Sequence, residues 1–82
     1  MFWETIKKMK YKLFYGYGLD TTKMECIGEY ASIEECERKI HSYIKENNFE
    51  SYYFRVTKQD DSFVWYDYGS WTKFFAIKKS QD

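Results

Sequence analysis

The sequence predicts an α+β fold, in which one helix packs on one face of a five-stranded antiparallel sheet in the order ββαβββ. Two observations favour this fold. Only one segment places apolar residues at helical spacing, and the rest of the chain alternates with the period of two that strands require. The 82 residues allow a single domain with one small core. We expect a flexible N-terminal arm at residues 1–9 and one domain at residues 10–79.

The first two strands are expected at residues 10–17 and 24–30, joined as a hairpin. Alternation puts the apolar and aromatic residues of the first strand mainly on one face. A register with Lys12 opposite Glu29 pairs opposite charges across the two strands, which stabilises a sheet. The pattern therefore predicts both the hairpin and its register.

The helix is expected from Ser32 to about Asn48. Ser32 and Glu35 have the spacing of a capping box, and the acidic residues of the first turn complement the positive end of the helix dipole. Asparagine tolerates the left-handed conformation that ends helices, so Asn47 and Asn48 predict the end. The apolar stripe consists of Ile33, Cys36, Ile40, Tyr43 and Ile44.

A three-strand meander follows the helix. The expected strands are 52–57, 63–68 and 73–77, with turns at 58–61 and 69–72. Tight hairpins would give the meander two different faces. One face holds Tyr52, Phe54, Val56, Phe63, Trp65, Phe74 and Ala76, with Asp67 as its polar member. The other holds Tyr53, Arg55, Val64, Tyr66, Tyr68, Phe75 and Ile77.

One helix covers only one face of the sheet, and we expect it on the face rich in Phe and Trp. The opposite face would then expose an aromatic patch that needs a cover. The candidates are a partner, a ligand, a second copy, or the N-terminal arm through Phe2, Trp3 and Ile6. The predicted binding surface is Tyr53, Arg55, Tyr66, Tyr68, Trp71 and Phe75. Asp67 is expected to accept backbone N–H groups of the turn that follows it.

The sequence contains few residues that could form a catalytic site. His41 is the only histidine, and neither Cys26 nor Cys36 is spaced from it as a nucleophile–base pair or a zinc site requires. Gly16-Tyr17-Gly18 lacks the remaining parts of a phosphate loop. We therefore expect no enzyme, no cofactor and no metal.

Charge and composition limit the partners and the location. Thirteen basic residues balance thirteen acidic ones, and no run approaches the roughly 18 apolar residues of a membrane span. Two cysteines are too few for a disulfide scaffold, and the start of the sequence lacks the features of a secretory leader. These observations favour the cytoplasm and argue against a membrane.

The residues leave two alternative functions open. The first is a nucleic-acid-binding module that uses an aromatic sheet face and the basic N-terminal segment. That segment, residues 1–23, has five lysines against two acidic residues. Residues 24–50 carry seven acidic residues against three basic ones, which predicts weak, salt-sensitive binding of single strands. The second is a homodimer that sequesters a small ligand between two aromatic faces.

The end of the chain contains the pattern W-x-D-Y-G-S-x-T-x-F-F-x-I, formed by Trp65, Asp67, Tyr68, Gly69, Ser70, Thr72, Phe74, Phe75 and Ile77. It resembles the ending of small proteins from phages and mobile elements of low-GC bacteria, and the preceding helix and strands extend the resemblance over residues 30–77. Such proteins would more naturally begin at Met9 than at Met1. The resemblance implies a setting, an accessory gene of a mobile element, in which small proteins are often binders that block a host enzyme or defence complex. We therefore favour a non-enzymatic binding protein, an inhibitor of the anti-defence type, that masks a host or defence protein surface in the host cytoplasm.

Overall fold

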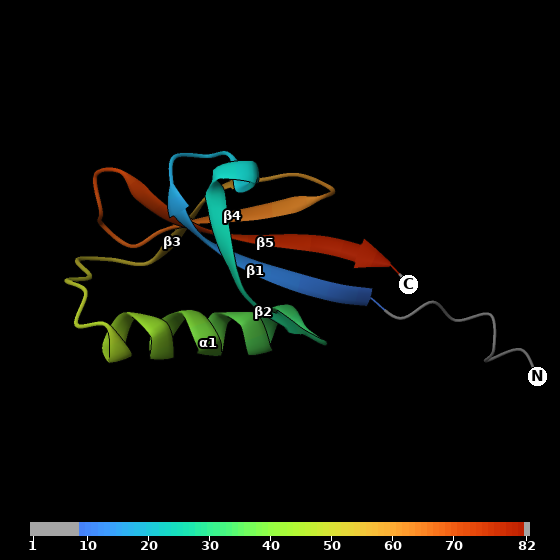
Figure 1. Ribbon diagram of the computed structural model, residues 1–82, viewed down its shortest axis with the longest axis horizontal. Helices are drawn as coiled ribbons and strands as arrows, with labels where there is room; N and C mark the ends of the chain where they lie inside the picture. The colour runs from blue at the N-terminus through green and yellow to red at the C-terminus, as the bar shows by residue number, and fades with distance from the viewer. Residues whose placement is uncertain (1–8, 82) are drawn as a thin grey trace, which may run out of the picture.

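The computed structural model describes residues 9–81 and confirms the α+β fold. Its strands form one antiparallel sheet in the order β2-β1-β5-β4-β3, and the helix runs along one face (Figure 1). Residues 1–8 of the expected arm, with the suggested cover through Phe2, Trp3 and Ile6, lie outside the described residues, whereas Met9 is the first residue of β1 and not part of an arm. The elements are β1 (Met9–Tyr17), the 3₁₀ turn η2 (Thr21–Lys23), β2 (Met24–Tyr30), α1 (Ile33–Glu46), β3 (Arg55–Gln59), β4 (Phe63–Asp67) and β5 (Lys73–Gln81).

The pairing of β1 with β5 joins the two halves of the chain. The register runs over nine residues of each strand, from Met9 opposite Gln81 to Tyr17 opposite Lys73. These two long strands form the centre of the sheet, and each carries a shorter neighbour from its own hairpin. The predicted pairing of β1 with β2 is confirmed at Lys12 and Glu29, and a bulge follows one residue later.

The helix begins and ends through local hydrogen bonds that its sequence predicts. The Ser32 hydroxyl accepts a bond from the Glu35 backbone N–H at 3.1 Å. The Glu35 carboxylate reaches back one residue further than in a standard capping box and accepts from the Ala31 N–H at 2.9 Å. At the other end, Asn48 has a positive φ of 55°, which turns the chain out of the helix.

The helix covers the sheet face that holds Tyr66, Tyr68 and Phe75, so the predicted choice of face is wrong. All three side chains are buried, together with Leu13, Tyr15, Val64 and Ile77 of the same face. The helix contributes Cys36, Ile40 and Ile44 to this core. The predicted binding surface and the ligand-binding homodimer both required these rings to be exposed.

The polar groups of the buried tyrosines and of Asp67 have hydrogen-bond partners in this arrangement. Tyr66 donates a hydrogen bond from its hydroxyl to Glu37 Oε2 at 2.7 Å, and the hydroxyls of Tyr15 and Tyr68 are 2.7 Å apart. The buried tyrosines therefore keep their polar ends satisfied under the helix. Asp67 lies on the opposite face, where its carboxylate stays outside the apolar core. Asp67 is buried there, and its hydrogen bonds to Gly69 and Tyr53 compensate for the loss of water around the charge.

The third strand differs most from the prediction. It begins at Arg55 instead of residue 52, and a bulge between Val56 and Lys58 shifts its register. Val56 therefore lies opposite Tyr66, and the ring of Phe54 stacks on that of Tyr66 with centroids 4.9 Å apart. Alternation alone had placed Phe54 and Val56 on the face of Trp65.

Truncating the helix stripe should measure how much the core depends on it. Ile40→Ala is expected to lower the free energy of unfolding by about 2–4 kcal/mol, because Ile40 is fully buried and its removal leaves a cavity. The exposed Lys45→Ala is the matched control on the same helix, with almost no expected cost. Urea unfolding compares the two variants. A larger loss for Lys45→Ala would mean that the buried stripe is assigned to the wrong residues.

Alkaline pH should weaken the fold through Tyr66. Burial, followed by the hydrogen bond to Glu37, raises the pKa of Tyr66 above its ordinary value of 10.0. The contribution of this group is therefore fully present below pH 10 and is lost as the pH rises above 10. Urea unfolding at pH 8 and pH 11 should show a smaller loss of stability for Tyr66→Phe than for the wild type. Tyr17→Phe, at an exposed ring, is the control, and an unchanged pH dependence for Tyr66→Phe would contradict the prediction.

Candidate functional site

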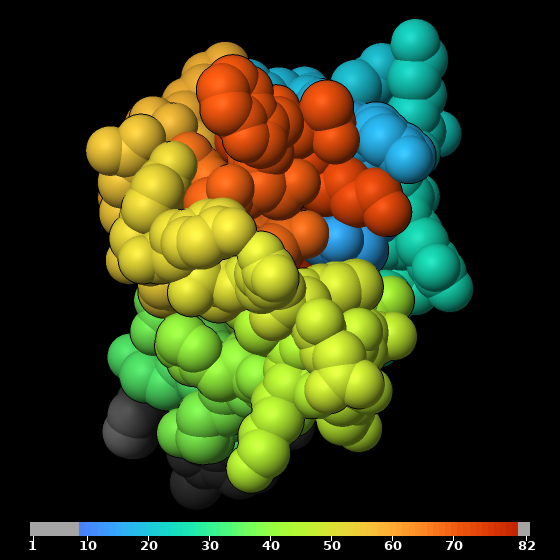
Figure 2. Space-filling model, turned by 90° about the vertical axis from the view of Figure 1, so that its left-hand side faces the viewer, coloured from blue at the N-terminus to red at the C-terminus, as the bar shows by residue number. Residues whose placement is uncertain are grey.

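Three connecting segments meet at one end of the sheet: the turn after β1, the loop between α1 and β3, and the turn between β4 and β5. The Gly18 N–H donates to the Thr72 carbonyl at 2.8 Å, and the Tyr52 N–H donates to the Tyr68 carbonyl at 3.2 Å. Figure 2 views this end directly, with the turn before β5 in orange-red beside the yellow loop that precedes β3. The backbone thus fixes the three segments against one another.

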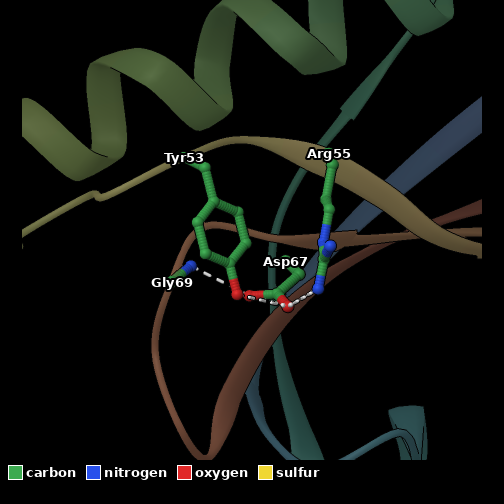
Figure 3. A network of polar contacts seen from close by, with 4 residues as sticks. All are labelled: Tyr53, Arg55, Asp67 and Gly69. Atoms are coloured by element: carbon green, nitrogen blue, oxygen red, sulfur yellow. Dashed lines mark hydrogen bonds and ion pairs between the residues drawn. The ribbon is translucent and has the colours of Figure 1, made fainter.

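Asp67, the last residue of β4, organises the side chains between two of these segments. Its Oδ1 accepts the Gly69 backbone N–H at 2.9 Å, as predicted for this carboxylate. Its Oδ2 accepts the Tyr53 hydroxyl at 3.1 Å and lies 3.6 Å from Arg55 Nη2 (Figure 3). The Arg55 guanidinium also lies over the Tyr53 ring, 4.7 Å from its centroid. One carboxylate therefore holds both a turn and an aromatic side chain.

The turn between β4 and β5 is further constrained at two positions. Gly69 has a φ of 101°, a backbone conformation that residues other than glycine rarely adopt. A Cβ at this position would lie 3.1 Å from the backbone nitrogen of Tyr52, so the neighbouring loop also excludes a larger residue. The Ser70 hydroxyl accepts the Lys73 N–H at 3.1 Å. These contacts leave the side chain of Trp71 as the most exposed part of the turn.

Large apolar side chains are exposed around these segments, and we call them the loop-end surface: Tyr17, Leu19, Tyr52, Tyr53 and Trp71. Trp71 is 98% exposed and Tyr52 is 74% exposed. Two open depressions, of about 420 and 340 Å³, share Tyr52, Gly69, Ser70 and Trp71 in their walls. The surface therefore combines projecting rings with hollows beside them.

The charges beside the loop-end surface are mixed. Lys73 Nζ lies 5.0 Å from the centroid of the Tyr17 ring, and the Tyr52 hydroxyl donates to Glu50 at 2.5 Å. With Arg55 and Asp67 nearby, cations and anions both border the rings. Such a surface suits a partner with polar and apolar groups better than one of uniform charge.

The structure separates the six residues of the predicted binding surface into two groups. Tyr53, Arg55 and Trp71 are exposed at this end, whereas Tyr66, Tyr68 and Phe75 lie in the core. Sequence reasoning missed three members of the surface: Tyr17, Leu19 and Tyr52. The sequence did contain a signal for Leu19 and Tyr17, because large side chains at a hairpin turn have few surrounding residues that could cover them.

The reactive side chains are dispersed. His41 is exposed and lies against the ring of Phe54, 4.6 Å between centroids, and Cys26 is exposed on β2. Burial raises the pKa of the Cys36 thiol to about 12, so it is protonated near neutral pH. Over residues 9–81 no cluster of histidine, cysteine and carboxylate side chains has the arrangement of a metal site. In the same part of the chain, no helix combines the length and apolar character of a membrane span.

Comparison with known proteins adds no relative to this description. The chain matches no family model, no curated protein and no solved structure.

The two cysteines should differ in reactivity as their burial differs. Cys26 is expected to react rapidly with a chromogenic disulfide reagent at pH 8, and Cys36 only when the protein unfolds, because it is buried and its thiol stays protonated. Cys26→Ser should abolish the rapid phase and leave the slow one. Two rapidly reacting thiols in the folded wild type would contradict the packing of Cys36 under the helix.

Proposed function

We propose that this protein is a non-enzymatic binding module that recognises a protein partner through the loop-end surface. The observation that carries the proposal is the exposure of Trp71, 98%, on a turn that hydrogen bonds hold in place. A tryptophan ring in water gains a large apolar contact area when a partner covers it. Tryptophan, tyrosine and arginine are also the residues that dominate the energy of protein interfaces.

The rigidity of the surface supports the same proposal. Binding loses affinity when side chains and loops must be ordered, and preorganised loops reduce that cost. Here the Tyr53 hydroxyl is bonded to Asp67, and the loop before β3 is bonded to the end of β4 through Tyr52 and Tyr68. Tyrosine, tryptophan, serine and glycine are also the residues that binding loops of antibodies use most.

We infer that the biological role is to mask a surface of another protein. A surface of projecting rings with a polar border can block a partner without performing chemistry on it. The resemblance of residues 65–77 to phage and mobile-element proteins supports a host or defence protein as the partner. On this proposal the protein is an inhibitor of the anti-defence type.

Parallel affinity captures test the proposal. Wild type, Trp71→Ala and Lys45→Ala serve as immobilised baits for a low-GC bacterial lysate, with mass spectrometry of the retained proteins. A specific partner should be retained by the wild type and by Lys45→Ala, the helix-side control, and lost with Trp71→Ala. With the purified partner, Trp71→Ala and Tyr52→Ala should each weaken binding by about 1–3 kcal/mol in calorimetry.

Thermal melts of the baits separate binding from folding. Trp71 and Tyr52 are exposed, so both variants should melt close to the wild type. A specific partner that binds the double variant Trp71→Ala, Tyr52→Ala as tightly as the wild type would exclude the loop-end surface as the recognition site.

A further inference from the structure

The sheet face opposite the helix carries a second group of side chains, which the register brings together. We call it the open face. Phe14 lies opposite Ala76, and Trp65 lies opposite Ala76 from the other side. Phe63 and Trp65 stack with centroids 5.7 Å apart. The open face thus has an aromatic centre built from β1, β4 and β5, and Phe14, Phe63 and Phe74 are partly exposed there.

Two lysines lie directly opposite each other beside this aromatic centre. Lys12 of β1 is paired with Lys78 of β5, and Phe63 of β4 is the neighbour of Lys78 on its other side. Like charges in directly opposed positions destabilise an antiparallel sheet. Both lysines are exposed, and within residues 9–81 no ion pair joins either of them to a carboxylate. Lys12 also has Glu29 opposite it on β2, whereas the neighbours of Lys78 are Lys12 and Phe63, so an anion bound at this pair would offset the charge that Glu29 leaves unbalanced.

Most of the other charged residues on the open face are basic. Register places Lys58 beside Trp65 and Lys10 opposite Ser80, while Arg55 lies opposite Asp67. The acidic residues of this face are already engaged, since Asp67 contacts Arg55 and Glu29 lies 3.8 Å from Lys10 Nζ. The protein is neutral as a whole. Its positive charge is nevertheless concentrated where aromatic rings are accessible.

We propose that the open face binds single-stranded nucleic acid. Exposed rings on an antiparallel sheet provide stacking surfaces for bases, and lysines around them bind the phosphates. A duplex hides the faces of its bases, so the aromatic residues would have no role in binding it. Phe14 and Phe63 are the stacking residues of the proposed site, and Lys12 and Lys78 are its phosphate contacts.

Fluorescence anisotropy with the full chain tests this site. The probes are fluorescein-labelled oligothymidylate and oligouridylate, titrated between 20 and 200 mM salt. We expect binding that weakens steeply as salt increases. Lys12→Gln with Lys78→Gln should weaken binding at the lowest salt about tenfold or more, and lower the slope of log K against log salt by about 1.4, or about 0.7 for each lost phosphate contact. Phe63→Leu should weaken binding about fivefold or more, since it removes a stacking ring.

The control is Lys39→Gln with Lys45→Gln, which removes the same number of charges from the helix side of the molecule. It should bind close to the wild type. Melting curves verify that each variant folds, and the Lys12, Lys78 double variant should melt close to the wild-type temperature, because it loses both the repulsion between the two lysines and the attraction of Lys12 to Glu29. Three results would each overturn the proposal: no binding of either probe at 20 mM salt, equal loss in the helix-side control, or an unchanged affinity in the Lys12, Lys78 variant.

Discussion

The carboxylate of Asp67 must keep hydrogen-bond partners wherever its strand places it, because an unpaired buried carboxylate costs several kcal/mol. Strand alternation puts this residue on the face opposite Tyr66, so its carboxylate lies outside the apolar core under the helix although the residue is buried, 8% exposed. On its own face the carboxylate is bonded to Gly69 and Tyr53 and lies beside Arg55. These contacts satisfy the buried carboxylate and hold the end of the sheet together.

The core itself is built around an aromatic cluster centred on Tyr15. Its ring lies 4.6 Å from Phe75 and 5.4 Å from both Tyr43 and Phe49, measured between centroids. These neighbours come from the central strand, the helix and the segment after it. A small domain has little core volume, and large rings fill it with few residues. Tyrosine rings also bring several phenol hydroxyls close to the core, and these hydroxyls need hydrogen-bond partners. The hydrogen bond between Tyr15 and Tyr68 partly meets this need.

This architecture gives the molecule three regions with different surface chemistry. The helix shields one face of the sheet, the loops project Trp71 and Tyr52 at one end, and the other face presents Lys12 and Lys78 among aromatic rings. The two proposed surfaces meet at the end of β4, where Arg55 and Asp67 lie between them. A protein partner at the loops and a nucleic acid on the sheet would therefore occupy neighbouring but distinct regions.

The sequence by itself determined the helix, its Ser32 cap, the order ββαβββ along the chain and the contact of Asp67 with the turn that follows, because all of these follow from local periodicity and local hydrogen bonds. The pairing of β1 with β5, which joins the two hairpins into one sheet, came only from the tertiary structure. It could not determine which sheet face the helix covers. Both faces of β4 and β5 are rich in aromatic residues, so alternation distinguishes the faces without ranking them. The bulge at Val56 and Lys58 and the hydroxyl of Tyr66 bonded to Glu37 decided the choice, and both depend on residues far apart in the chain. The exposure of Tyr52 and Trp71 followed only from that tertiary arrangement.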